Sequence, residues 1–128
     1  MRIAGKWRIA EMDEWDQDDF DLMGPAFFSF DARGSVSFRF IAVQGWMDCR
    51  HGEREGRPFV EFTWDGNDEL DPASGRGWAR IEDDGTLSGH IFIHRGDDSG
   101  FKAVRAEAES RPGARRSRDG RRARRSVR

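Results

Sequence analysis

Side chains suited to ligand binding recur at alternate positions in the stretch from 75 to 105. They are an indole, a guanidinium, a phenyl ring and two imidazoles, in Trp78, Arg80, His90, Phe92 and His94. A strand places every second side chain on one face, so Trp78 and Arg80 share one face and the other three share a face of the next strand. We predict that these residues line a ligand-binding site. The alternative is a half-exposed sheet whose histidines face the solvent.

The spacing of the two histidines argues against a shared metal ion. At about 3.3 Å per residue, His90 and His94 stand about 13 Å apart along a strand. A metal site would therefore need His51 or carboxylates from other strands. We predict no metal and no cofactor.

Acidic residues gather in three polar segments and form a second group of candidates. The residues are Asp16, Asp18, Asp68, Asp71, Asp97 and Asp98. If these segments meet at one barrel end, they form an acidic rim that could bind a cation or a basic peptide, or supply a catalytic carboxylate pair. The first segment lacks the spacing of an EF-hand loop. Solvated loops rich in turn-forming residues are the alternative.

The charge of the chain is divided unevenly. Residues 107–128 hold nine arginines and three acidic residues, whereas residues 1–106 hold 13 basic and 21 acidic residues. The tail has no aromatic residue and one aliphatic residue larger than alanine, so burial cannot offset its ordering entropy. We predict a barrel domain over residues 1–106 and a disordered arginine-rich tail over 107–128. Contact with nucleic acid is expected only through the tail.

The single cysteine, Cys49, excludes an internal disulfide and is typical of a reducing compartment. We expect an ordinary structural thiol there. No apolar run approaches the roughly 20 residues of a membrane span, and the N-terminal residues lack the apolar core of a secretory signal. We predict a cytoplasmic protein without membrane contact. The sequence leaves its oligomeric state open, a homodimer included.

Apolar residues alternate with polar ones along most of residues 2–106, which predicts about eight short strands. The residues expected to point inward are Trp7, Phe28, Phe30, Phe38, Phe40, Phe62, Trp64, Ile91 and Ile93. Between 11 and 25, four aspartates in six positions disfavour a long helix, so we predict a short helical turn or an ordered loop. We also predict a long irregular loop over 65–77 and a type I′ turn at Asp84–Gly85.

This pattern predicts an all-β fold, a small antiparallel barrel of about eight strands. The alternative is an open β-sandwich. A barrel of this size whose predicted inward residues fill the interior has no room for a sizeable ligand.

The pair Gly5-x-Trp7 in the first strand resembles the Gly-x-Trp signature of lipocalins and fatty-acid-binding proteins, together called calycins. In those proteins the tryptophan closes one end of an up-and-down barrel, and a basic residue of the last strand packs on it. The resemblance implies that Arg105 takes this part here. It also implies a calycin-like barrel in which the acidic segment after the first strand lies where some of these proteins carry a helical lid.

The segments WDQDDFD, GNDELDPASGRGWA and DDGTLSGHIFIHRGDDSGFKA resemble those of a family of small bacterial proteins without an assigned function. The resemblance covers most of residues 5–105. It implies a bacterial protein and supplies no catalytic or binding residue.

We favour a non-catalytic binding module that takes a small molecule or a protein partner at the acidic barrel end. One alternative is a hydrolase or isomerase that uses carboxylates and His90, and another is a nucleic-acid-associated protein that binds through its tail. A cavity lined by Trp78, Arg80 and His90 would favour the first hypothesis. A carboxylate of raised pKa within a cleft would favour the second.

Overall fold

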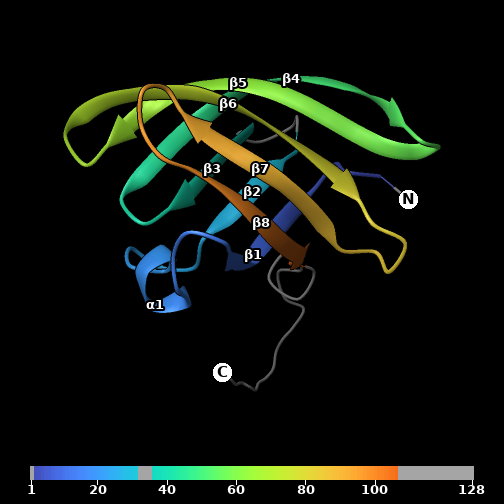
Figure 1. Cartoon of the computed structure of the whole chain (residues 1–128), viewed down its shortest axis with the longest axis horizontal. Helices are drawn as coiled ribbons and strands as arrows, with labels where there is room; N and C mark the ends of the chain where they lie inside the picture. Colours follow the sequence, from blue (N-terminus) through green and yellow to red (C-terminus); the bar gives the residue numbers. More distant parts are fainter. Residues whose placement is uncertain (1, 32–35, 107–128) are drawn as a thin grey trace.

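The computed structural model describes residues 2–31 and 36–106, which form eight strands and one short helix (Figure 1). The strands are β1 (Lys6–Met12), β2 (Phe27–Phe30), β3 (Val36–Phe40), β4 (Val43–Arg54), β5 (Arg57–Asp68), β6 (Asp71–Ile81), β7 (Leu87–Ile93) and β8 (Asp98–Arg105). Each strand pairs antiparallel with the next, and β8 pairs with β1. The predicted antiparallel barrel is confirmed, and the closing pair rules out the open sandwich.

The short helix expected after the first strand is also confirmed, as α1 (Gln17–Phe20). The carbonyl of Asp16 accepts hydrogen bonds from the backbone N–H groups of Asp19 and Phe20, both at 3.0 Å. Phe20 is buried, and its carbonyl accepts the N–H of Ile41 at 2.9 Å. The Phe20 ring and this backbone bond therefore help to tie the acidic segment to the barrel, together with the bond from the N–H of Asp13 to the carbonyl of Gly100 at 3.0 Å.

Aromatic side chains fill the interior of the barrel. Eight of the nine residues expected to point inward are buried, and Ile93 is half-buried against them. The ring of Phe28 lies 4.5 Å from that of Phe101 and 5.4 Å from that of Phe38, centre to centre. Phe38 also meets Trp64 edge to face at 5.0 Å. These contacts place rings where a hollow barrel would hold a ligand.

Trp7 and Arg105 pack against each other where β1 begins, which is the contact expected of Arg105. The Arg105 guanidinium lies 4.0 Å from the centre of the Trp7 ring. It also donates hydrogen bonds of 2.6 Å to the carbonyls of Ala4 and Arg2. Gly5 has φ +116, and a Cβ there would come within 2.9 Å of the guanidinium, so both the backbone angle and the contact favour glycine.

The long loop predicted over 65–77 is wrong. These residues complete β5 and begin β6, with Asp68 paired opposite Asp71 across a two-residue turn. Pro72 and the glycines of this segment are typical of loops, yet Pro72 takes a strand position opposite Asn67. Strands β4 and β5 have 12 residues each and β6 has 11, and Figure 1 shows them reaching past the shorter strands.

The type I′ turn predicted at Asp84–Gly85 is also wrong, because Gly85 has a positive φ and Asp84 does not. The turn is longer: the N–H of Glu82 bonds to the carbonyl of Thr86 at 2.8 Å. Positive φ values at two successive positions occur instead at Glu55 and Gly56, between β4 and β5. Among the described residues, no helix is long and apolar enough to cross a membrane.

Candidate functional site

The outer face of β4, β5 and β6 carries the most concentrated group of rings and guanidinium groups. The register of the strands sets this arrangement. Glu61 lies opposite Arg50 on β4 and opposite Trp78 on β6. Thr63, two residues on, lies opposite Asp48 and Arg76. Side chains that are up to 17 positions apart in the sequence therefore stand next to one another.

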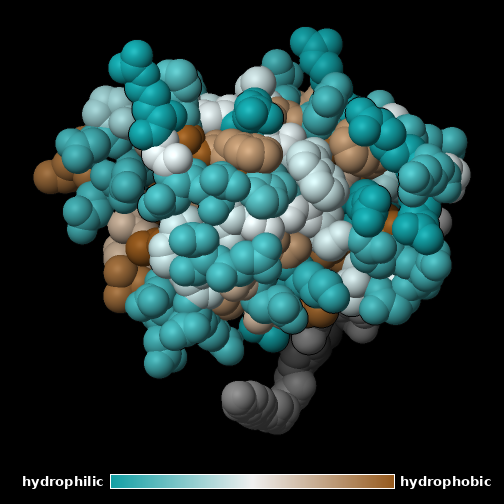
Figure 2. Space-filling view, viewed as in Figure 1, coloured by the Kyte–Doolittle hydropathy of each residue, from teal (hydrophilic) through white to brown (hydrophobic). Residues whose placement is uncertain are grey.

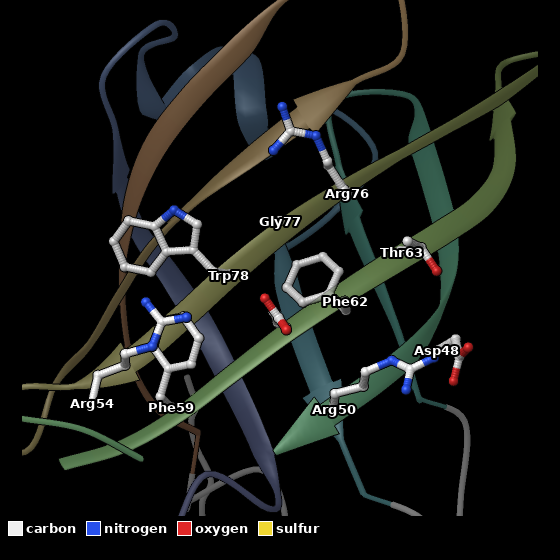
Figure 3. A pocket seen from close by; sticks show the side chains of 10 residues that line it. Asp48, Arg50, Arg54, Phe59, Phe62, Thr63, Arg76, Gly77 and Trp78 are labelled. Atoms are coloured by element: carbon white, nitrogen blue, oxygen red, sulfur yellow. The ribbon is translucent and has the colours of Figure 1, made fainter. Parts of the chain in front are cut away.

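A cleft of about 370 Å³ opens on this face, and we name it the Trp78 cleft (Figure 3). Its lining residues are Asp48, Arg50, Arg54, Phe59, Glu61, Phe62, Thr63, Arg76, Gly77 and Trp78. The rings of Phe59 and Trp78 stack 6.0 Å apart at 19°. Figure 3 shows these rings and Arg54 on one side of the cleft, with Arg50 and Asp48 on the other. A smaller adjoining hollow of about 260 Å³ adds Arg80 to the same rings.

The charged side chains that line the Trp78 cleft are exposed, and their contacts leave their hydrogen-bonding groups available. Arg54 stacks on Phe59 at 4.2 Å, and Arg80 lies 5.9 Å from the Trp78 ring and pairs with Glu82. Within residues 2–31 and 36–106, no ion pair or side-chain hydrogen bond engages Arg50, Arg54, Arg76, Asp48 or Glu61. The cleft therefore offers both donors and acceptors beside an aromatic surface.

A second cleft, of about 550 Å³, adjoins the first, and we name it the Arg95 cleft. Its lining residues are Thr63, Trp64, Ser74, Gly75, Arg76, Phe92, Ile93, His94 and Arg95, with no carboxylate among them. Thr63 and Arg76 line both clefts. The Arg76 guanidinium lies 4.3 Å from the centre of the Phe92 ring, which holds it at the junction of the two clefts.

The structure divides the predicted ligand-binding set between these clefts. Trp78 and Arg80 lie beside the first, and Phe92 and His94 line the second. His90 stands opposite Trp78 on β7 but lines neither of them. Its Nε2 lies 2.5 Å from a carboxylate oxygen of Asp98, and its ring contacts Phe92 at 4.6 Å. Its contacts are thus with the barrel's own side chains.

The predicted acidic residues all lie toward one end of the barrel. Strand directions place α1, the β5–β6 turn and the β7–β8 turn at the same end (Figure 1). Asp16 and Asp18 belong to the first, Asp68 and Asp71 flank the second, and Asp97 and Asp98 end the third. In the described part of the chain, no three His, Cys, Asp or Glu side chains are grouped closely enough to hold a metal ion.

Three exposed apolar side chains lie at the same end: Leu22 (63% exposed), Met23 (60%) and Leu70 (96%). Figure 2 shows a group of brown atoms at this left end, on a face that is mostly teal and white.

Cys49 is half-buried and packs against the core. Burial, followed by the negative charge of Asp48, raises the pKa of its thiol to about 11. The thiol is therefore protonated near neutral pH and is a poor nucleophile.

Sequence reasoning missed the arginines of the site, above all Arg50, Arg54 and Arg76. Arg76 carried a usable signal, because it precedes Trp78 by two residues and so shares its strand face. The sequence alone contains no comparable signal for Arg50 and Arg54. Their position next to the other cleft residues depends on the register of β4 against β5, which the Glu55–Gly56 turn sets.

Comparison of the chain with protein-family models, with curated proteins and with solved structures gave no match.

Proposed function

We propose that this protein is a non-catalytic binding module for a small planar molecule that carries an anionic group, held in the Trp78 cleft. The stacked pair Phe59–Trp78 carries this proposal. The exposed Arg50, Arg54 and Arg76 line the same cleft and take part in no ion pair within the described residues. A flat ring system fits against stacked rings, and a guanidinium can donate two parallel hydrogen bonds to a carboxylate or phosphate. A volume of about 370 Å³ suits a small molecule.

The proposal moves the site away from the acidic barrel end and from the interior. Rings occupy the interior, as the contacts of Phe28 and Phe38 show. The Arg95 cleft reaches the acidic end at the β7–β8 turn, but the stacked pair Phe59–Trp78 lies in the Trp78 cleft. Two of the residues named from the sequence, Trp78 and Arg80, stay in the proposed site.

Glu82 and Asp84 lie outside the Trp78 cleft and have lowered pKa values. Hydrogen bonds lower both pKa values, first of all from Ser88 and Thr86 respectively. A general acid needs the opposite shift. The raised pKa of Cys49 likewise argues against a thiolate nucleophile.

Nuclear magnetic resonance of the full-length, 15N-labelled protein tests the proposal. The indole N–H signal that disappears in Trp78→Phe identifies Trp78 among the five tryptophans. We expect orotate, a planar carboxylate, and adenosine 5′-monophosphate, a planar phosphate, to shift that signal saturably. Glycerol 3-phosphate, which is not planar, should leave it in place. Trp78→Ala should abolish binding, whereas Trp78→Phe should retain most of it, because a phenyl ring still stacks.

The matched pair of arginine variants is Arg54→Gln and Arg8→Gln. Arg54 lines the cleft, whereas Arg8 lies on β1, which neither pairs with nor adjoins β5 or β6. Arg54→Gln should weaken orotate about tenfold, as expected for the loss of one charge-assisted hydrogen bond. Arg8→Gln should change nothing. Equal weakening by both variants, or an unmoved Trp78 signal, would refute the proposal.

A further inference from the structure

The Arg95 cleft has a donor set that the proposed function does not use. It presents two guanidinium groups, one imidazole and two hydroxyl groups, from Arg76, Arg95, His94, Thr63 and Ser74. These donors come from β5, β6 and the β7–β8 turn, so three separate segments converge on one hollow. No carboxylate lines it, in contrast to the Trp78 cleft with Asp48 and Glu61.

The two guanidinium groups of this cleft are available to a ligand. Arg76 is fixed by its stacking on Phe92 at 4.3 Å, which leaves the edge of the guanidinium plane for hydrogen bonds. Within the described residues, neither Arg76 nor Arg95 takes part in an ion pair or a side-chain hydrogen bond. Arg95 has φ +62 in the β7–β8 turn. Residues other than glycine rarely adopt this backbone conformation, and it fixes the direction of the turn.

The number of donors distinguishes a phosphate from a carboxylate. A carboxylate has two oxygens, and one guanidinium can engage both. A phosphate monoester has three terminal oxygens and a charge of about −1.5 to −2 near neutral pH. Two guanidinium groups with hydroxyl and imidazole donors around them match the larger group better. The cleft is therefore best suited to a phosphate.

We infer that the Arg95 cleft is a phosphate subsite and that the ligand of the Trp78 cleft is a phosphorylated planar molecule of the mononucleotide class. This inference rests on the proposed function, since the ring must lie in the Trp78 cleft. The clefts meet at Thr63 and Arg76. Trp78 and Arg76 are two positions apart on β6, about 6.6 Å along the strand, a span that one sugar can bridge.

The charge of the molecule favours one phosphate over a strand of many. Residues 1–106 hold 21 acidic and 13 basic residues, and the repulsion that this excess exerts on a ligand grows with each added negative charge. A mononucleotide can contact Arg76 and Arg95, and its single phosphate is only weakly repelled by the net negative charge of residues 1–106. A polynucleotide would place further phosphates beside the carboxylates of the Trp78 cleft.

Isothermal titration calorimetry of the full chain at 150 mM salt tests the inference with adenosine 5′-monophosphate, adenosine and orotate. We expect the monophosphate to bind about 100-fold more tightly than adenosine and more tightly than orotate. Arg95→Asn should weaken the monophosphate about tenfold and leave adenosine and orotate unchanged. Asparagine tolerates a positive φ, so the turn is expected to survive, and an unchanged melting temperature checks that it does.

The outcomes separate the two proposals. If orotate binds and shifts the Trp78 signal while the monophosphate binds no better than orotate, the phosphate subsite is refuted and the planar-anion site stands. The same conclusion follows if Arg95→Asn weakens all three probes equally. If none of the probes shifts the Trp78 signal, both proposals fail. If the monophosphate binds only through nonspecific attraction to the arginine-rich tail, its affinity will be the same for Arg95→Asn and wild type. That result would also refute the subsite.

Discussion

Gly77 and Trp78 show how neighbouring residues on one strand serve the core and the surface. Trp78 points outward into the cleft, whereas Gly77 is buried and faces the ring of Phe62. Because Gly77 has no side chain, the Phe62 ring can occupy the space beside it. The candidate site and the packing of the barrel therefore depend on the same short segment of β6.

Gly77→Ala should destabilise the protein by about 1–3 kcal/mol, as overpacking of a filled core does. The added Cβ would lie 2.6 Å from Cζ of Phe62 and 2.7 Å from the carbonyl oxygen of His90. Chemical denaturation of both proteins measures the difference. Gly52→Ala is the matched control, because a Cβ at that strand position meets no atom within 4 Å. Equal stability of Gly77→Ala and wild type would show that the Phe62 ring moves aside freely.

Glu82 predicts a specific dependence of stability on pH. Hydrogen bonds from Ser88 and Arg80 lower its pKa from 4.5 in the folded state. A lowered folded pKa stabilises the fold at pH values above the unfolded pKa, and this contribution is lost as the pH falls through the folded pKa. Glu82→Gln removes the contribution, so we expect the variant to be less stable than wild type at pH 7 and the difference to shrink as the pH falls through the folded pKa.

Urea denaturation at pH 7, 5, 4 and 3 gives the comparison for Glu82→Gln. Glu53→Gln provides the control, since Glu53 is exposed on β4 and has no ion pair in the described part of the chain. A stability difference that stays constant from pH 7 to pH 3 would assign the effect to packing of the side chain instead of its charge.

At the scale of elements, the pair β1–β8 closes the barrel, and Arg105 is its most connected side chain. Arg105→Gln should destabilise the fold by about 2 kcal/mol, because the variant loses the stacking on Trp7 and charge-assisted bonds to two carbonyls. Thermal unfolding followed by circular dichroism measures the effect. Lys102→Gln, at an exposed position of the same strand, should be nearly neutral. If both variants lose similar stability, the positive charge on β8 stabilises the fold, and the contact of Arg105 with Trp7 does not.

The elements also show what the sequence could predict. Alternation of apolar residues identified the strands and the core, because each inward position needs a large apolar side chain and each outward one does not. The short α1 followed from the helix-breaking aspartates. The error over 65–77 arose because glycine and proline are local loop signals, whereas here cross-strand pairing outweighs them.

The site was harder to predict than the fold, since it depends on which strand positions face one another. Trp78, Arg80, Phe92 and His94 were found because alternation alone puts them on outer faces. Arg50 joins Trp78 only through two successive pairings, to Glu61 and then across to β6. Register across three strands is set by turns and by core packing together, and a single sequence does not display it.

At the scale of the whole molecule, the closed barrel is complete at Ala106. This residue is buried, and its N–H donates to the carbonyl of Lys6 at 3.0 Å. The predicted disordered tail, 107–128, lies outside the described residues. Within the described residues, the eight strands and the closing pair all lie before residue 107. The division of the chain into a barrel domain and a tail stays a prediction.

A chain truncated after Ala106 should therefore fold, with a melting temperature within about 4 °C of the full chain at 150 mM salt, a shift equivalent to at most about 1 kcal/mol.

A chain truncated after Gly100 should not fold. It lacks Ala103, which lies opposite Ile9 on β1 and Leu87 on β7, so the barrel would open along its core. Because the chain ending at Ala106 loses nine arginines and only three acidic residues, its stability should also rise more steeply with added salt. If that chain fails to fold while the full chain folds, the tail is part of the folding unit and the domain boundary at 106 is wrong.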